Sequence, residues 1–389
     1  MNMYEDGFFM NIAPSPSFGG GLCRIVAELD GERIVRADPH IGYMHKGIEK
    51  LLETSGVMQG ICISGRLNYA FPSVCEYPYI LAVEKLSGIK VPERAAYLRS
   101  MISEMVRIAS HFRALSRCAA DCGALAALRI SDEVCEVLSS FFVQVCGKSH
   151  PSCYFCPGGV RKDISQNLLD RAAHWIERKL PSKIKDMERL SVRNRIFKSR
   201  TTGIGVISEE DAVSHGFSGV NLRASAVAFD LRRSEPYDAY KNLEFSVPVG
   251  TAGDAYTRCL LRVMEIRQSA SLVLQAISKM PAGEVLAPQM RLAVHRSDGS
   301  AEAEGSRFKL LTEGYPLPSG EVYVPTEAPW GELGVYLVSN GGVVPYRCRF
   351  RSAGFAHLQA VSKLLAGLTL SDVGPVLSSL DINMTEVDR

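Results

Sequence analysis

The stretch PERAAYLRSMISEMVRIASHFRAL, residues 92–115, carries the clearest structural signal of the chain. Its apolar side chains repeat at three- and four-residue steps, which is the spacing of one face of an α-helix. A proline suits the first helical turn because the amide hydrogen that it lacks would have no partner there. The stretch therefore predicts one long helix packed along one face. The residues of that face are Leu98, Met101, Ile102, Met105, Ile108, Ala109, Phe112 and Leu115.

Helical spacing recurs in four further stretches, each with polar or charged residues between the apolar ones. These stretches lie at about 131–147, 164–190, 254–280 and 353–368. Together with the long helix, they indicate a helical bundle at the centre of the molecule.

Strand patterns lie on both sides of this bundle in the sequence. Residues 22–36 alternate apolar and polar side chains around Asp30 and Gly31, which predicts a two-stranded hairpin. Residues 320–342, GEVYVPTEAPWGELGVYLVSNGG, predict strands joined by turns. Residues 295–306 contain no large apolar side chain and are expected to form an exposed excursion.

The expected fold class is therefore α+β, with a small N-terminal sheet, a central helical bundle, and C-terminal strands with a helix. Three regions of one compact unit follow from this order. They are an N-terminal β-containing region at 1–80, the helical bundle at 81–283 and a C-terminal α+β region at 284–389.

Composition gives no sign of a nucleic-acid or membrane-spanning protein. The 44 basic and 42 acidic residues are interspersed and leave a net charge of +2, so no polybasic arm suggests nucleic acid. No apolar run approaches the roughly 20 residues of a membrane span, so membrane association is expected only through partners. The first ten residues lack the features of transit and signal peptides. Eleven scattered cysteines favour a reducing compartment.

Read alone, the candidate motifs are weak. Cys153 and Cys156 form the one clear CxxC and His150 is close to them, but a fourth metal ligand is missing, so free thiols are favoured over a metal or redox role. The glycine-rich run at 18–22 predicts a flexible turn rather than a nucleotide site. His40 and His45 suggest surface or capping residues, and Asp121 suggests a solvated carboxylate.

Eleven separated blocks across the chain carry a resemblance to a known family. They include ADPHIGYMHKGIEKLLE at 37–53, RNRIFKSRTTGIGVIS at 193–208, VPVGTAGDAYTRCLLRVMEIRQS at 247–269 and SLDINMTEVDR at 379–389. In content and order these blocks resemble the 49-kDa subunit family of respiratory complex I. That family is related to the large subunits of nickel–iron hydrogenases.

The resemblance implies a hydrogenase-large-subunit-like fold whose old active-site cavity has become a quinone headgroup pocket. An iron–sulfur cluster would lie beside it in a neighbouring subunit, and this chain itself would bind no metal or other cofactor. The residues agree, because the segment Asn68-Tyr69-Ala70-Phe71 stands where hydrogenases carry their first nickel-binding CxxC. The final cysteine pair is replaced by Asn383 and Glu386.

In the family, a tyrosine and a histidine are thought to donate hydrogen bonds to the quinone carbonyls, and an aspartate pairs with that histidine. The tyrosine matches Tyr69 and the aspartate matches Asp121. Reduction places negative charge on the quinone oxygens, which a phenol or imidazolium can stabilise and then protonate. The histidine is missing, because Gly20 stands at its position.

Other positions expected near the pocket also depart from the family pattern. The histidine of the family's HRG motif matches His45, but Lys46 stands where the motif has arginine. A compact ammonium therefore replaces a planar guanidinium. Cys156 replaces an arginine before Pro-Gly-Gly, and Pro151 replaces a histidine for which His150 is a possible substitute.

These departures leave two functional hypotheses open within the family. In the favoured one, the chain forms the ubiquinone-reduction pocket of an NADH:quinone oxidoreductase, with Tyr69 as the main donor. In the other, it is mainly an assembly scaffold in a divergent complex with an impaired pocket. A self-contained hydrogenase or other metal enzyme is a third hypothesis, which metal analysis tests.

The expected partners are the other complex I subunits, above all the cluster-bearing small-subunit-like chain and the membrane arm. The expected location is the matrix side of the mitochondrial inner membrane. The alternative is the cytoplasmic side of a bacterial membrane.

Overall fold

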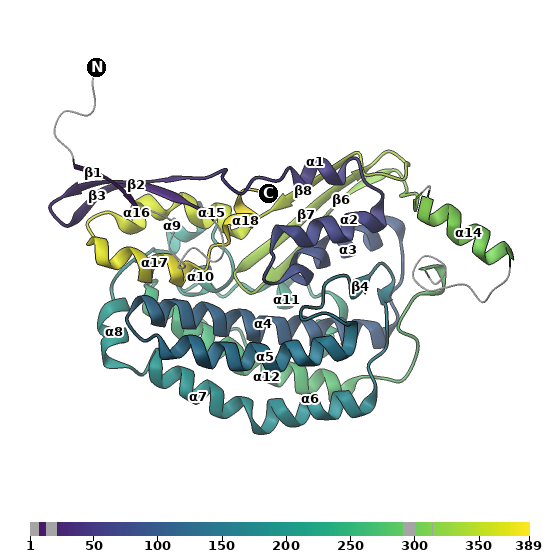
Figure 1. Cartoon of the computed structure of the whole chain (residues 1–389), viewed down its shortest axis with the longest axis horizontal. Helices are drawn as coiled ribbons and strands as arrows, with labels where there is room; N and C mark the ends of the chain where they lie inside the picture. Colours follow the sequence, from purple (N-terminus) through teal and green to yellow (C-terminus); the bar gives the residue numbers. More distant parts are fainter. Residues whose placement is uncertain (1–7, 13–21, 291–300, 313) are drawn as a thin grey trace, which may run out of the picture.

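The computed structural model describes residues 8–12, 22–290, 301–312 and 314–389. Its helical layer is built on α4 (Glu93–Asp121), which covers nearly all of the stretch at 92–115 that predicted one long helix. α4 is buried on most of its circumference because it packs between α5 (Ala126–Cys146) and α12 (Ala255–Lys279). α6 (Gln166–Arg178) and α7 (Leu180–Leu190) complete this layer, at the bottom of Figure 1. The central helical bundle is thus present.

Two expected helices are interrupted. Residues 164–190 form α6 and α7 rather than one helix, because Pro181 in the first turn of α7 has no amide hydrogen with which to continue α6. Residues 353–368 likewise divide into α15 (Ala353–Gln359) and α16 (Val361–Leu365).

The N-terminal sheet contains the expected hairpin. β2 (Arg24–Asp30) and β3 (Arg33–His40) are antiparallel, and Gly31 has φ of 61° in the turn between them, a conformation that glycine adopts without strain. β1 (Phe8–Ile12) adds an edge strand to β2 that the sequence patterns did not predict. The sheet packs on C-terminal residues, since Ile34 exchanges backbone hydrogen bonds with Gly367 and Leu368.

A second antiparallel sheet, formed by C-terminal residues, has the order β6-β7-β8. The strands are β6 (Gly320–Ala328), β7 (Gly331–Ser339) and β8 (Arg347–Arg351), so the expected strands at 320–342 are confirmed. α3 (Pro72–Ser87) packs against β6 and β7. Figure 1 shows this sheet and α3 above the helical layer.

Buried ion pairs join the sheet to the helices. Arg223 lies 2.6 Å from a carboxylate oxygen of Glu265 on α12 and 2.7 Å from one of Glu327 on β6. Arg232 pairs at 3.1 Å with Glu104 on α4. All of these side chains are almost fully buried, so removing one partner would leave an uncompensated charge in the core.

The remaining elements of the described chain are mostly short. They are α1 (Ile48–Leu52), α2 (Val57–Ser64), η2 (Gly65–Leu67), β4 (Phe155–Cys156), β5 (Gly159–Val160), α8 (Arg195–Thr201), α9 (Glu209–Ser214), α10 (Gly219–Arg223), α11 (Leu231–Ser234), η3 (Asp238–Asn242), η4 (Pro288–Met290), α14 (Ala301–Thr312), η5 (Leu370–Asp372), α17 (Val373–Leu380) and α18 (Met384–Val387).

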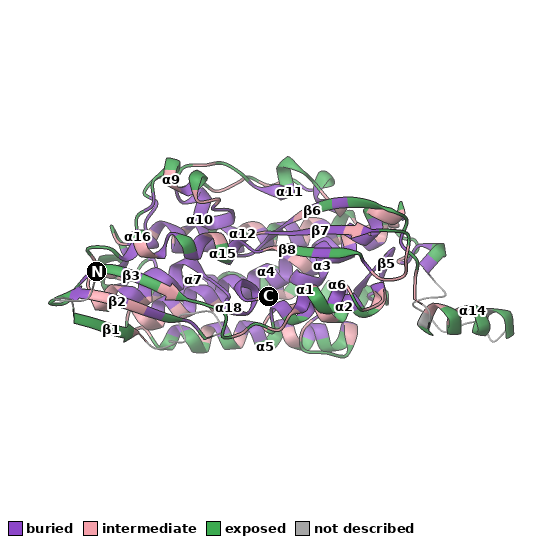
Figure 2. Cartoon of the chain, turned by 90° about the horizontal axis from the view of Figure 1, so that it is seen from above, coloured by how far each residue is buried: buried purple, intermediate pink, exposed green. Residues whose placement is uncertain are grey.

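The expected excursion at 295–306 falls partly outside the described residues. Its described part, from residue 301, begins the helix α14 and is exposed as expected. Figure 2 shows α14 as an exposed helix projecting from one end of the molecule. Within the described ranges, no helix is both long and apolar enough to cross a membrane. The α+β class is confirmed, whereas the division at residues 80 and 283 stays a prediction.

Candidate functional site

A tight turn presents Tyr69 at the surface between η2 and α3. The Asn68 side chain is buried, and its oxygen accepts hydrogen bonds from the backbone amides of Ala70 at 3.0 Å and Phe71 at 3.1 Å. These bonds fix the backbone on either side of Tyr69, whose own side chain is 58% exposed. The phenol is therefore held on an ordered loop and can meet a molecule from outside the chain.

Lys46 lies directly against this phenol. Its ammonium nitrogen is 4.0 Å from the centre of the Tyr69 ring, within the range of a cation–π contact. The same nitrogen donates a hydrogen bond of 2.9 Å to the backbone carbonyl of Arg66. Lys46 thus joins the loop at 41–47 to the Tyr69 loop and places a positive charge beside the aromatic ring of Tyr69.

The C-terminal segment contacts both of these loops. The Thr385 hydroxyl donates to the carbonyl of Leu67 at 2.5 Å. The Asp388 carboxylate accepts from the amides of Gly42 at 2.8 Å and Met44 at 2.7 Å, and the Asp388 carbonyl lies 2.7 Å from Nδ1 of His45. Three segments that are distant in sequence therefore meet around Tyr69.

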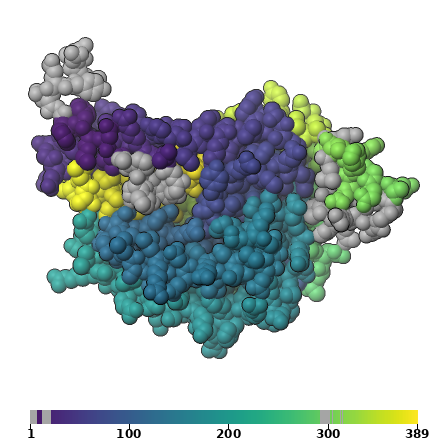
Figure 3. All heavy atoms as spheres, viewed as in Figure 1, coloured from purple at the N-terminus to yellow at the C-terminus, as the bar shows by residue number. Residues whose placement is uncertain are grey.

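The figures show the same convergence at the level of the fold. The C-terminus lies beside α18, near the middle of the molecule (Figure 1). Figure 3 shows C-terminal atoms, in yellow, between the N-terminal sheet and the helical layer. We call the segments at 41–47, 65–71 and 383–389 the three-segment site.

Glu386 is the buried carboxyl group of this site. It stands on α18, and its Oε1 accepts a 2.7 Å hydrogen bond from the Ser352 hydroxyl. Burial raises the pKa of Glu386 to about 7, and the bond from Ser352 opposes only part of that rise. A carboxyl group with such a pKa can hold or release a proton near neutral pH.

His150 approaches the Tyr69 loop from the helical layer. Its ring meets the Phe71 ring edge-on, with 6.4 Å between the centres, and the Arg113 guanidinium lies 5.3 Å from the centre of Phe71. Burial, and secondarily the charge of Arg113, lowers the pKa of His150. The imidazole is thus kept mainly neutral, and it packs on a residue two positions along the loop from Tyr69.

Asp121 stands at the last position of α4, facing the C-terminal helices. A Cβ added to Gly374 of α17 would lie 3.4 Å from Cγ of Asp121, so the carboxylate packs directly against this helix. One turn earlier, Arg117 pairs with Asp381, which leads into α18. Asp121 is therefore linked to the three-segment site through the C-terminal chain.

Gly20, the position of the expected histidine, lies outside the described residues.

Cys156 has different surroundings from the other predicted pocket residues. Its side chain is fully buried in an apolar cluster with Ile89, Leu286 and Met290, and burial raises the pKa of its thiol to about 11. The Cys156 carbonyl accepts a hydrogen bond from Arg99 at 2.7 Å. Its assignment to the pocket stays a prediction.

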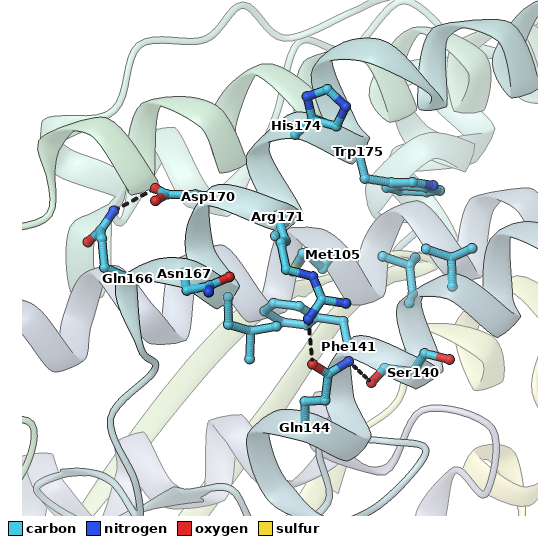
Figure 4. Close-up of a pocket in the computed structure, with 14 residues that line it drawn as sticks. Met105, Ser140, Phe141, Gln144, Gln166, Asn167, Asp170, Arg171, His174 and Trp175 are labelled. Atoms are coloured by element: carbon cyan, nitrogen blue, oxygen red, sulfur yellow. Dashed lines mark hydrogen bonds between the residues drawn. The ribbon is translucent and has the colours of Figure 1, made fainter.

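A separate pocket of 730 Å³ lies between α5 and α6 and contains none of the predicted site residues. Phe141 and Trp175 line it, and Arg171 donates a hydrogen bond to Gln144 at its edge (Figure 4). In the described part of the chain, no group of three or more His, Cys, Asp or Glu side chains could bind a metal ion.

The sequence interpretation missed Thr385 and Asp388. Both lie in the block SLDINMTEVDR, and the partners of Asp388 lie in the block ADPHIGYMHKGIEKLLE. The two blocks signalled the family, but nothing in their local patterns indicates that they touch.

Comparisons with known proteins agree with the resemblance seen in the sequence. Residues 121–389 match the family model described as "Respiratory-chain NADH dehydrogenase, 49 Kd subunit". An NADH-quinone oxidoreductase subunit of Orientia tsutsugamushi (strain Ikeda) is 43% identical over 388 residues, covering 98% of this chain and 97% of the relative. The subunit of the same name from Wolbachia sp. subsp. Brugia malayi (strain TRS) is 45% identical, covering 98% of each.

A third relative, an NADH-quinone oxidoreductase subunit of Rhizobium meliloti (strain 1021), is 44% identical and is also covered over 98% of each chain. These comparisons give no support to the alternative of a divergent assembly scaffold. The identity extends over nearly the whole length of each pair, so the likeness is not that of one shared domain. This chain therefore belongs to the family of the 49-kDa subunit of respiratory-chain NADH dehydrogenase.

Proposed function

We propose that this chain is a core subunit of an NADH:quinone oxidoreductase and that its three-segment site lines the place where quinone is reduced. The observation that carries the proposal is the exposed Tyr69 phenol on a fixed loop, with the Lys46 ammonium 4.0 Å from its ring centre. The relatives, which are named as subunits of NADH-quinone oxidoreductase, support the same role.

The chemistry of quinone reduction fits these side chains. Two electrons and two protons convert the two quinone carbonyls into hydroxyls, and negative charge develops on the oxygens before they are protonated. The Tyr69 hydroxyl can donate a hydrogen bond to one oxygen, and the Lys46 charge stabilises the developing anion. An iron–sulfur cluster of a neighbouring subunit would supply the electrons, and this chain would bind no cofactor.

We assign supporting roles to the remaining predicted residues. The His45 ring, held by the Asp388 carbonyl, orients the 41–47 loop, and His150 supports the Tyr69 loop through Phe71. Asp121 is the supporting carboxylate at the end of α4. In place of the histidine expected at Gly20, a water molecule or a partner's side chain would donate the hydrogen bond to the second quinone oxygen.

We further propose a hydrogenase-large-subunit-like fold. The Thr385–Leu67 hydrogen bond supports it, because it brings the segment of Asn383 and Glu386 against the 68–71 loop. These are the two places where the resemblance puts the missing nickel-binding cysteine pairs.

The partners would be the cluster-bearing subunit and the membrane arm, since the relatives are named as parts of a multi-subunit oxidoreductase. The relatives named above are bacterial and are named as subunits of NADH-quinone oxidoreductase, which supports a membrane-associated complex. The matrix side of a mitochondrial inner membrane stays our proposal for its location, with the cytoplasmic side of a bacterial membrane as the alternative.

Substitution of the phenol tests this function. Tyr69→Phe in the assembled enzyme should lower quinone reduction by about 100-fold, because it removes a donor that acts in the transition state. Reduction of ferricyanide by NADH, which does not need the quinone site, should remain. Tyr346→Phe, at a tyrosine that is 69% exposed, is the matched control. Unchanged quinone reduction in Tyr69→Phe would refute the proposal.

A further inference from the structure

Two thiols from distant segments meet at the surface. Cys62 stands on α2 and is exposed, whereas Cys153 lies in the turn before β4, 91 residues later. Their sulfur atoms are 3.1 Å apart. A disulfide bond is roughly 2.0 Å long, so a movement of about 1 Å would join the two sulfurs.

The backbone of Cys153 is held in an unusual conformation for a residue with a side chain. Its φ is 55°, in the left-handed region that non-glycine residues rarely occupy. The Glu76 carboxylate holds it there, accepting from the Cys153 amide at 2.7 Å and from the Ser152 hydroxyl at 2.8 Å. These contacts keep the Cys153 thiol directed at Cys62.

The surroundings of the pair favour a thiolate on Cys62. A hydrogen bond donated by the Cys153 thiol lowers the pKa of Cys62 to about 6, with smaller contributions from the charges of Arg161 and Lys148, and it outweighs burial and the charge of Glu76, which raise that pKa. The same hydrogen bond raises the pKa of the Cys153 thiol. A thiolate next to a thiol is the arrangement found where cysteines react with disulfides.

Glu76 can take up the second proton. Its Oε1 lies 3.8 Å from the Cys153 sulfur, and burial raises the pKa of this carboxyl group to about 8. In its ionised form, this carboxylate is near enough to accept the proton of Cys153.

An open pocket of 630 Å³ gives access to the pair. Cys62 and Cys153 both line it, together with Lys148, Arg161 and Lys162, which are exposed cations. The pocket therefore suits a small anionic molecule. A second close pair, Cys118 and Cys259 at 3.5 Å, is fully buried and offers no such access.

We propose that Cys62 and Cys153 form a reversible disulfide site whose oxidant is a small anionic disulfide of the glutathione type. The Cys62 thiolate attacks one sulfur of the oxidant, its S–S bond breaks, and one thiolate leaves and takes a proton from solvent. Cys153 gives its proton to Glu76 and attacks the Cys62 sulfur, which breaks the mixed disulfide and releases the second half of the oxidant as a thiolate that takes the proton from Glu76. The chain loses two electrons, and the oxidant is reduced to two thiols.

Oxidised glutathione and the full-length chain provide the test, with mass spectrometry of peptides kept under non-reducing conditions. The wild type should yield a linked Cys62–Cys153 peptide and release two glutathione molecules per chain. Cys153→Ser should retain one glutathione on Cys62, whereas Cys62→Ser should leave Cys153 unmodified. Cys146→Ser, at a thiol that lines the same pocket, is the matched control and should behave as the wild type.

Alkylation rates give a second measurement that does not depend on the linked peptide. At neutral pH, Cys62 should react about fivefold faster than Cys146, because its larger thiolate fraction outweighs the lower nucleophilicity of a more acidic thiol. Glutathione accumulating on Cys146, no linked peptide in a wild-type chain with native circular dichroism, or stoichiometric zinc on the two thiols would each overturn the proposal.

Discussion

The hydroxyl of Thr385 donates a hydrogen bond to the backbone carbonyl of Leu67, with 2.5 Å between the two oxygen atoms. Both partners are buried, although 318 residues separate them in the sequence. Leu67 ends η2 directly before the turn that carries Tyr69. The position of the Tyr69 loop therefore depends on the C-terminal segment.

Thr385→Val removes this hydrogen bond while keeping the shape of the side chain. It should lower the free energy of unfolding by about 1 kcal/mol, because the buried carbonyl of Leu67 loses its donor. In the assembled enzyme, KM for quinone should rise and KM for NADH should stay the same. Thr312→Val, on the exposed helix α14, should change neither value. If the two substitutions had equal effects, the Thr385–Leu67 hydrogen bond would not hold the Tyr69 loop in place.

Asp388→Ala removes the carboxylate that holds the 41–47 loop. Two backbone amides, those of Gly42 and Met44, lose a charged acceptor. Hydrogen bonds to charged groups contribute roughly 1.5–3 kcal/mol each, so we expect a loss of about 3 kcal/mol in chemical denaturation. Asp38→Ala, which breaks only an exposed pair with Arg36, is the control and should have little effect. If both variants unfold alike, the loop does not depend on Asp388.

Arg99→Ala should strongly destabilise the chain. Arg99 is fully buried, pairs with Glu84, and donates to the carbonyls of Gly159 at 3.1 Å and Cys156 at 2.7 Å. Removing one member of a buried ion pair typically costs about 3–5 kcal/mol. Thermal unfolding measures the loss, and Arg129→Ala on the surface of α5 should show no comparable change. A small effect of Arg99→Ala would mean that water replaces the guanidinium.

The buried carboxyl group of Glu386 should make stability depend on pH. Folding raises its pKa from the ordinary 4.5 to about 7, so the folded chain binds a proton more tightly than the unfolded chain. The stability that this group contributes is therefore fully present below the unfolded pKa and is lost as pH rises through the folded pKa.

Glu386→Gln tests this dependence, because the amide oxygen can still accept from Ser352. Between about pH 4.5 and about pH 7, the wild type should lose on the order of 3 kcal/mol relative to the variant. Denaturation curves across this range supply the measurement. Parallel pH profiles for the two proteins would show that Glu386 keeps its ordinary pKa.

The sequence predicted the parts of the fold that have a regular period. α4, α5 and α12 lie where apolar residues repeat at helical spacing, and β2, β3, β6 and β7 lie where alternation and turns occur. β1 was not predicted because its residues, FFMNI, show no alternation and are mostly exposed. Its formation depends on pairing with β2, which is not encoded in its own pattern.

For the candidate site, the sequence supplied residues but not their arrangement. Tyr69 and Asp121 came from the family resemblance, and their roles stay predictions. The contacts of Asp388 with the 41–47 loop, and of Cys62 with Cys153, join segments far apart in the chain. No local pattern records such pairs, so three-dimensional structure is needed to find them.

A cryo-EM map of the assembled oxidoreductase with quinone bound would test the central claim most directly. We predict that one carbonyl oxygen of the quinone lies within hydrogen-bonding distance of the Tyr69 hydroxyl, roughly 2.6–3.2 Å, with the Lys46 ammonium beside it. A headgroup bound away from the three-segment site, or a site filled by side chains of a partner subunit with no path for quinone, would contradict the claim.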